Sequence, residues 1–204
     1  MKPLTKMTSK DYDELKSLVL LNLLGERGRA VELLRRGVPP AEVCGSLSSS
    51  TEWVRNFNPE KEMETCEKLG VRLLSWFDPD YPKLLKEIYD PPLVLYMKGN
   101  FEESDEAALA IVGTRRPSFY GRTQAKRFAR ELAQAGLTIV SGFAKGIDQI
   151  AHQAALEVSY GRTIAVLGCG IDVKYPSGSE ELFERIAQRG AVISEFPLGT
   201  QPRG

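Results

Sequence analysis

The sequence predicts an α/β protein with a Rossmann-like, doubly wound parallel sheet, preceded by a small all-helical module. Three observations carry this prediction. The sequence changes character near residue 105. Downstream of it, short apolar runs without polar alternation take turns with amphipathic segments of helical length, which is typical of buried parallel strands and their crossover helices. Upstream of residue 70, apolar residues recur at largely helical spacing.

The second half contains four expected strands, and a helix stands between each pair. Glycines close two of these helices, at Gly136 and Gly190, as helix ends often require. Right-handed crossovers then leave a Rossmann-like sheet as the leading topology. The expected strands are residues 107–113, 137–142, 163–170 and 191–196, and the expected helices are residues 118–136, 146–158 and 179–190.

The first half divides into a helical module and a connector. Residues 1–70 form the expected module, in which Gly25 and Gly28 interrupt the helical pattern and suggest two helices joined by a turn. Residues 71–105 contain four prolines between short strand-like runs and are too apolar for a loose linker, so we expect a connector packed on the next domain. Residues 106–204 form the expected Rossmann-like domain, incomplete at its C-terminal end.

Composition restricts the classes of function. Formal net charge is zero, but residues 1–106 hold 15 Lys and Arg against 19 Asp and Glu, and residues 107–204 hold 12 against 8. From Ala107 to Arg130 there are six basic residues and no acid; the alternative to a binding surface is a solvated helix face. The longest apolar run is far shorter than the roughly 20 residues of a membrane span. Three cysteines without metal-ligand spacing favour the reducing cytoplasm.

Four loops follow the expected strands, and each begins with a small residue or soon reaches one. They read "GTRR" (113–116), "SGFAKGID" (141–148), "GCGIDVKYP" (168–176) and "SEFPLGT" (194–200). In open parallel sheets, ligands bind beyond the carboxyl ends of the strands. Small residues let a ligand approach the backbone, and helix N-termini present N–H groups to anions. Tight turning alone explains any one glycine, but four such loops in a row indicate a ligand site.

The first of these loops is not a dinucleotide-binding loop. Arg115 and Ser118 stand where that fingerprint has further glycines. A guanidinium at a strand end presents a fork of donors to phosphate oxygens, so Arg115 favours a ligand with several phosphates; the alternative is a surface ion pair. Arg116, Lys145 and Lys174 stand where they would extend the same positive rim.

Catalytic machinery is sparse in the sequence. His152 is the only histidine, which excludes a His-rich metal site. Asp148 and His152 are four residues apart, and hydrogen bonding at a helix start is favoured there over an acid–base dyad. Ser141 and Ser194 have no evident base nearby in the sequence, and Cys169 has no basic partner. The residues alone thus point to no catalytic group, cofactor or metal, and the family resemblance described next implies a protein that is not an enzyme.

The same four stretches, in the same order, resemble the DNA-processing protein A family (DprA, also called Smf). They are "AIVGTRRPSFYG", "GLTIVSGFAKGIDQIAHQAAL", "GRTIAVLGCGIDVKYP" and "GAVISEFPLGTQP", and "DPDYPKLLKEIYDPPLVLYMKGN" resembles the family's lead-in to them. The helical first part more weakly resembles the family's sterile-alpha-motif-like domain, related to helix-hairpin-helix modules. The family usually has Asn at the position of Ser179, and its next segment does not follow Gly204, so we expect the natural protein to continue.

The resemblance implies a cytoplasmic protein that binds single-stranded DNA during natural transformation and helps to load the RecA recombinase onto it. It implies single-stranded DNA and RecA as partners, a possible homodimer and no membrane association. Tyr175 or Phe143 would offer a ring on which a base stacks. The DNA-binding residues it implies, with the basic rim, are Gly113, Thr114, Arg115, Arg116, Ser141, Gly142, Phe143, Lys145, Gly146, Gly168, Gly170, Lys174, Tyr175 and Pro176.

Two other readings compete with this one. A nucleotide-binding enzyme of a related Rossmann-like fold, of the nucleoside-monophosphate phosphoribohydrolase type, also has glycine loops at strand ends, and Glu195 would have to act in it. Its typical "PGGxGT" loop is absent, and "FPLGT" matches only in part. For the first 70 residues, whose charge is unsuited to binding DNA alone, the alternative is a purely protein-docking element.

Overall fold

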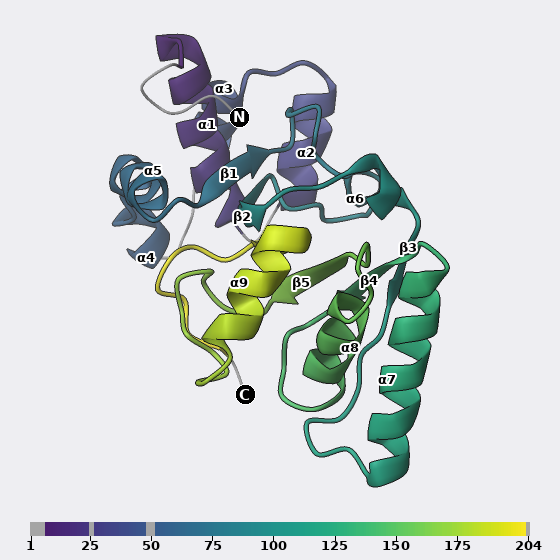
Figure 1. The fold of residues 1–204 in the computed structure, drawn as a ribbon. Coiled ribbons are helices and arrows are strands. Elements are labelled where there is room, and N and C mark those ends of the chain that lie inside the picture. Colours follow the sequence, from purple (N-terminus) through teal and green to yellow (C-terminus); the bar gives the residue numbers. More distant parts are fainter. Residues whose placement is uncertain (1–6, 25–26, 48–51, 203–204) are drawn as a thin grey trace. The chain divides into compact units, whose positions relative to one another are not determined.

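The computed structural model describes residues 7–24, 27–47 and 52–202 (Figure 1). These residues fall into two compact units, one up to Tyr96 and the other from Met97. This division lies inside the expected connector 71–105, whose separate character therefore stays a prediction. Among the described residues, no helix combines the length and the apolar character that a membrane crossing needs.

The first unit is mainly helical. Its longest helix, α1, begins with a capping box in which Thr8 accepts the Asp11 N–H at 3.2 Å and Asp11 accepts the Thr8 N–H at 3.4 Å. Leu15 and Leu18 of this helix are buried, as the helical spacing predicts. The elements are α1 (Ser9–Asn22), α2 (Arg27–Arg35), α3 (Pro40–Ser46), α4 (Glu52–Arg55), α5 (Pro59–Lys68), β1 (Arg72–Ser75), α6 (Lys83–Lys86) and β2 (Val94–Gly99), whose last residues enter the second unit.

Two polar or small positions of this unit have structural roles that the sequence pattern did not reveal. Asn22 interrupts an apolar run, yet it is buried, and its side-chain oxygen accepts the Leu93 N–H at 2.8 Å. The sequence pattern predicts that Gly28 interrupts a helix, but in the structure Gly28 lies inside α2. A Cβ at Gly28 would lie 3.3 Å from the Tyr89 carbonyl oxygen, so glycine makes room for Tyr89. Gly25 lies outside the described residues.

The second unit contains the expected alternation of parallel strands and helices. The strands β3 to β6 lie side by side in sequential order and pair in parallel, with Leu109 beside Ile139, Ile139 beside Thr163 and Ile164 beside Ala191. The elements are a 3₁₀ helix (Glu103–Glu106), β3 (Ala108–Ala110), α7 (Phe119–Gln134), β4 (Thr138–Ser141), α8 (Ile147–Leu156), β5 (Thr163–Leu167), α9 (Glu180–Arg189) and β6 (Ala191–Ser194).

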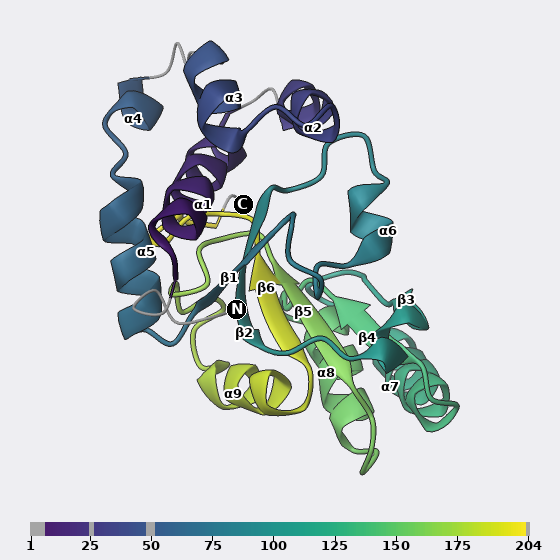
Figure 2. The same ribbon diagram turned by 90° about the horizontal axis from the view of Figure 1, so that it is seen from above.

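The sequential strand order places α7, α8 and α9 on one face of these four strands (Figure 2). Right-handed crossovers between neighbouring strands always return on the same side of the sheet. Small side chains let the first two helices pack closely, and Ala129 and Ala133 of α7 meet Ala151 and Ala154 of α8 over Ile139. The four carboxyl ends of the strands therefore open onto one edge, where the helices begin.

The boundaries of α7 follow from local chemistry. Ser118 caps its start by accepting the Gly121 N–H at 3.1 Å. At its end Gly136 has a φ of +88°, and the next N–H, of Leu137, returns to the Leu132 carbonyl at 3.1 Å. This is a Schellman-type ending, and it confirms that Gly136 terminates the helix.

Candidate nucleic-acid interface

The first strand-end loop, residues 111–118, packs tightly against the start of α8. A Cβ on Gly113 would lie 2.7 Å from the Ile147 side chain, so only glycine fits there. The Thr114 carbonyl accepts the Ile147 N–H at 3.3 Å, and the Thr114 hydroxyl accepts the Arg116 N–H at 3.2 Å. Arg115 and Arg116 are both exposed. The loop thus holds its backbone inward and leaves its two guanidinium groups in solvent.

The second loop, residues 142–146, is joined to the first by a buried carboxylate. Asp148 accepts the Gly113 N–H at 3.2 Å and the Ala144 N–H at 3.4 Å, and its side chain fills the space where a Cβ of Gly142 would lie. Ser141 donates its hydroxyl to the Ile111 carbonyl at 2.6 Å. These contacts tie the first two loops together and occupy the N–H groups of Gly113 and Ala144.

Phe143 does not present its ring to a ligand in this structure. The side chain is 3% exposed and packs against His152 and Phe183, with ring centroids 6.0 and 6.1 Å away. Its φ of +62° is unusual for a residue with a Cβ and turns the side chain into the unit. The expectation that a base stacks on Phe143 therefore does not fit this conformation.

The third and fourth loops are joined in a similar way. Gly170 donates its N–H to the Thr200 carbonyl at 2.8 Å, and Asp172 accepts the Gly199 N–H at 2.8 Å. A Cβ at Gly170 would lie 2.7 Å from the Pro197 carbonyl oxygen, so this glycine is required by the close approach of the two loops.

Of the remaining predicted residues of the third loop, one is buried and the others are exposed. Pro176 is buried and follows a cis peptide bond from Tyr175. Lys174 is exposed, and the Tyr175 ring is 38% exposed, so Tyr175 keeps a face that a base can reach. Gly168 is exposed at the end of β5.

The second and third loops meet through α8 and α9. Gln149 donates its side-chain amide to the Ser179 hydroxyl at 2.7 Å, so Ser179, where the family usually has Asn, receives a contact from α8. Beside this contact lies an open hollow of about 160 Å³. It is lined by Gln149, Gln153, Gly178, Ser179, Glu181, Leu182 and Arg185.

The cations at this edge are free to meet a ligand. Arg115, Arg116, Lys145 and Lys174 are exposed, and within the described part of the chain none of them forms an ion pair. Since the amides of Gly113 and Ala144 bind Asp148, the side-chain cations are the main donors left for phosphate oxygens. Each strand-end loop except the fourth contributes at least one of these cations.

The titratable groups that the sequence offers as candidates for catalysis make structural contacts or are buried. Asp148 bonds to the loops, and His152 lies 2.6 Å from the Thr163 hydroxyl, so the two do not form a dyad. Burial, with a smaller effect of Asp172, raises the pKa of the Cys169 thiol and keeps it protonated at neutral pH. Glu195 is half-buried directly after β6. Among the described residues, no three His, Cys, Asp or Glu side chains gather as metal ligands.

The structure therefore brings the predicted loops to one edge, where Asp148, Asp172 and Gln149 hold them together. Sequence reasoning named Asp148 only as a hydrogen-bonding group at a helix start, and it missed Asp172 and Gln149. Their signal in the sequence is weak, because an acid or amide two or three residues after a glycine is common in any loop or helix start.

A parallel sheet whose strand-end loops are tied together, and whose exposed arginine and lysine side chains make no ion pair with the described residues, defines a Rossmann-like protein with a basic carboxyl edge. The chain belongs to the DNA recombination-mediator protein A family, whose model matches residues 72–204. It is 43% identical over 151 residues to Protein Smf of Synechocystis sp., covering 72% of this chain and 38% of that protein. It is also 43% identical over 162 residues to the DNA processing protein DprA of Streptococcus pneumoniae, covering 79% and 57%.

Solved structures are similar as well. The X-ray structure of DNA processing protein A from Streptococcus pneumoniae matches with a TM-score of 0.71 and 31% identity, over 97% of this chain and 71% of that one. The protein from Helicobacter pylori, for which a single-stranded DNA binding mode is described, matches with a TM-score of 0.57 and 35% identity, over 65% and 59%. The chain thus spans between 38% and 57% of the two relatives compared by sequence.

Proposed function

We propose that this chain binds single-stranded DNA at the carboxyl edge of its parallel sheet. The supporting observation is that three interlocked loops of one unit present Arg115, Arg116, Lys145 and Lys174 in solvent, with no acidic partner among the residues that the structure describes. Successive phosphates of a flexible strand are the ligand that such spaced cations suit, and Tyr175 offers a half-exposed ring beside them. The single-stranded DNA binding described for the Helicobacter pylori relative supports the same ligand.

The biological role that we propose is DNA uptake and recombination. The chain protects incoming single strands and helps to load RecA onto them, in the cytoplasm and without an enzymatic step. Membership of the DNA recombination-mediator protein A family supports this role. Faster formation of RecA filaments on single-stranded DNA in the presence of the full-length protein is the expected result, and no acceleration would restrict the role to DNA binding.

The DNA-binding proposal is tested by titrating labelled oligo-dT with the chain and with Arg115→Ala. Losing one charge-assisted contact of about 1.5–3 kcal/mol weakens binding by roughly ten- to a hundredfold. Between about 50 and 200 mM salt, the slope of log affinity against log salt should fall by about 0.7 in the variant, since one phosphate contact is lost.

Arg36→Ala is the matched control for this experiment. Arg36 lies in the other unit, its side chain is 68% exposed, and it pairs with Glu32. The control removes the same charge, so an equal weakening by both variants would show general electrostatics rather than a site. Binding that is unchanged in Arg115→Ala would refute the proposed interface.

A further inference from the structure

The first turn of α7 exposes two aromatic rings next to the strand-end loops. Phe119 is 86% exposed and Tyr120 is 72% exposed. Single exposed apolar residues are common on protein surfaces, but two adjacent and nearly bare rings are not. The rings follow Arg115 and Arg116 by only a few residues, so they lie beside the cations of the proposed DNA site. Within the described part of the chain, neither ring packs on another aromatic ring or under a cation.

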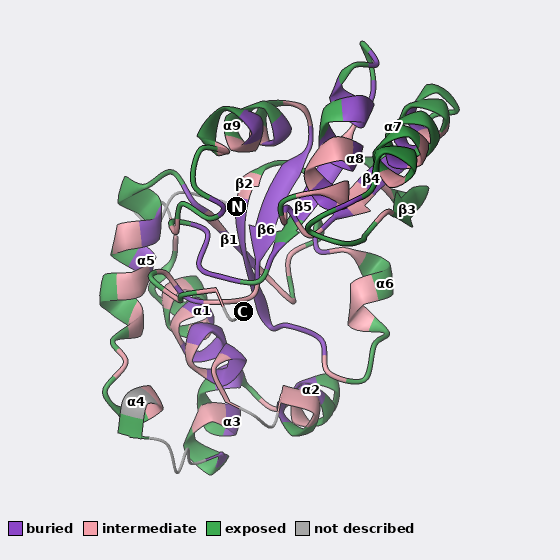
Figure 3. Cartoon of the chain, turned by 90° about the horizontal axis from the view of Figure 1, so that it is seen from below, coloured by how far each residue is buried: buried purple, intermediate pink, exposed green. Residues whose placement is uncertain are grey.

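Cations continue from these rings along the outer face of the helix. Ala125, Ala129 and Ala133 turn toward the core, which leaves the opposite side in solvent (Figure 3). Arg122, Lys126 and Arg130 follow Phe119 at helical spacing along one flank of the helix, and the exposed residues of α7 include four basic side chains. They are Arg122, Lys126, Arg127 and Arg130.

Two of these cations are free of acidic partners. Lys126 lies 2.7 Å from Glu157, and Arg127 lies 3.9 Å from Glu131. Arg122 and Arg130 make no ion pair with any residue that the structure describes. The exposed face of α7 therefore combines rings at its start with unpaired positive charge along its length. Aromatic side chains interleaved with cations are the means by which proteins bind unpaired nucleotides without reading their sequence.

We infer that Phe119 and Tyr120 form a platform on which bases of single-stranded nucleic acid stack as the strand leaves the strand-end loops. The phosphates of these nucleotides then pass Arg122 and Arg130 along the outside of α7. The occupant is an unpaired strand, because the bases of a duplex are stacked on each other and cannot reach the rings. This inference rests on the proposed function, since it extends the path of the same strand.

The inference is tested with the double variant Phe119→Ala/Tyr120→Ala and two oligo-dT lengths, about 16 and about 4 nucleotides, which bracket usual single-strand site sizes. Stacking contributes about a tenfold gain in affinity per base. The long oligonucleotide should therefore lose about tenfold or more in the variant, while the short one, held by the loops, changes little. The wild-type chain should also prefer oligo-dT to an abasic strand of equal length, and the variant should lose this preference.

Two further variants serve as controls. Tyr160→Ala removes a ring that is 64% exposed but lies between α8 and β5, away from the strand ends, where its hydroxyl bonds to the Gln134 carbonyl. It should bind like the wild type. Tyr120→Phe keeps the ring and should also keep the affinity for the long oligonucleotide. Because Phe119 and Tyr120 are on the surface, thermal unfolding of Phe119→Ala/Tyr120→Ala and of Tyr120→Phe should match that of the wild type.

The outcomes separate this inference from the proposed function. If oligo-dT does not bind, or if Arg115→Ala binds as well as the wild type, the proposed function fails. If Arg115→Ala is weakened but Phe119→Ala/Tyr120→Ala binds both lengths like Tyr160→Ala, the platform on α7 is refuted and the loop site stands. An equal loss for oligo-dT and the abasic strand also refutes stacking.

Discussion

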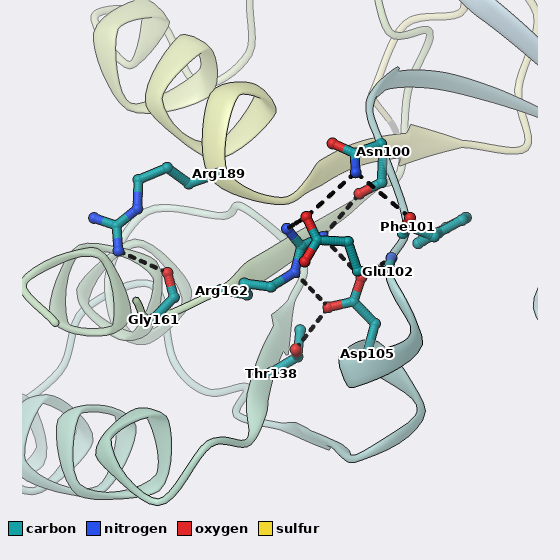
Figure 4. A network of polar contacts seen from close by, with 8 residues as sticks. All are labelled: Asn100, Phe101, Glu102, Asp105, Thr138, Gly161, Arg162 and Arg189. Carbon is teal, nitrogen blue, oxygen red and sulfur yellow. Dashed lines mark hydrogen bonds and ion pairs between the residues drawn. The ribbon is translucent and has the colours of Figure 1, made fainter. Parts of the chain in front are cut away.

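Arg162 and Asp105 form a two-pronged ion pair at the amino edge of the parallel sheet (Figure 4). The guanidinium donates from Nε and from one terminal nitrogen to the two carboxylate oxygens, both at 2.9 Å. Thr138 donates its hydroxyl to the same carboxylate at 2.7 Å. Burial by itself raises the pKa of Asp105, but the hydrogen bonds from Arg162 and Thr138 outweigh it and hold the pKa below its usual value. The pair therefore stays charged at neutral and mildly acidic pH.

Replacing Arg162 by Ala should destabilise the second unit. The two side chains are 13% and 7% exposed, so the change leaves a buried carboxylate without its partner, which costs about 3 kcal/mol. Urea unfolding measures the loss. Because the pair lies at the edge opposite the candidate DNA site, oligo-dT affinity should stay unchanged in the folded variant.

Arg127→Ala provides the comparison for this prediction. Arg127 and Glu131 are 3.9 Å apart with side chains 54% and 62% exposed, so this pair should contribute less than about 0.5 kcal/mol. Similar urea midpoints for the Arg162 and Arg127 variants would contradict the structural role of the Arg162 pair.

Asp148→Asn should weaken DNA binding through the shape of the loops. The carboxylate accepts N–H groups of both the first and the second loop, and an amide can replace only one of these acceptors. A buried donor left without a partner costs about 1–3 kcal/mol. We expect a lower urea midpoint and several-fold weaker oligo-dT binding, with an unchanged salt slope because no cation is lost.

Whether Asp148→Asn weakens or strengthens oligo-dT binding decides between an effect of loop geometry and an effect of charge. Removing a negative charge near a phosphate site should by itself strengthen binding. Tighter binding by Asp148→Asn would therefore show that charge, rather than loop geometry, controls this edge. Asp13→Asn, which changes a carboxylate with a 61% exposed side chain on α1, controls for a general effect of net charge.

Gly146→Ala should perturb the same loops by steric contact. Gly146 has a φ of +95°, and a Cβ there would collide with the Thr114 carbonyl oxygen. Gly136 has a nearly equal φ of +88° with nothing within 4 Å of the Cβ position. Gly136→Ala should thus cost only the backbone strain of about 1 kcal/mol, whereas Gly146→Ala adds the collision.

Urea unfolding and oligo-dT titration of both glycine variants test this prediction. Only Gly146→Ala should weaken binding, because it separates the first two loops. Equal stability losses in the two variants, with DNA binding intact in both, would mean that the contact between these loops is not required.

Features that depend on local chemistry were predictable from the sequence. The order of strands and helices in the second unit follows from runs of apolar residues and from helix caps such as Ser118 and Gly136, which act over a few residues. The position of the four loops at one edge follows from parallel pairing alone. For this reason the sequence located Arg115 and Lys174 correctly at strand ends.

Features that depend on contacts between distant segments were not predictable. The burial of Phe143 results from a left-handed backbone conformation and from Phe183, 40 residues further on. The sequence predicts that Asp148 forms hydrogen bonds at the start of a helix, yet its carboxylate accepts the N–H of Gly113, 35 residues away. The spacing of Gly28 resembles a turn, but its role is to admit Tyr89. No pattern within a few residues encodes such pairs.

The single histidine should make the stability of the protein sensitive to mild acid. His152 is fully buried, and Thr163 donates its hydroxyl to the Ile139 carbonyl at 2.6 Å, so His152 Nδ1 must be the donor toward Thr163. Its Nε2 then has no hydrogen-bond partner among the described residues. Burial lowers the pKa of His152 to about 4, and the Ser141 backbone offsets part of this effect.

Because the folded state resists protonation, the unfolded chain takes up a proton first as the pH falls below about 6.5. The free energy of unfolding should therefore decrease between pH 6.5 and the folded pKa of about 4, by roughly 3 kcal/mol in total. Urea midpoints across this range should fall for the wild type and less steeply for His152→Gln, which has no group that titrates there. Carboxylates affect both proteins alike, so parallel curves for the two would show that His152 is not the origin of the acid sensitivity.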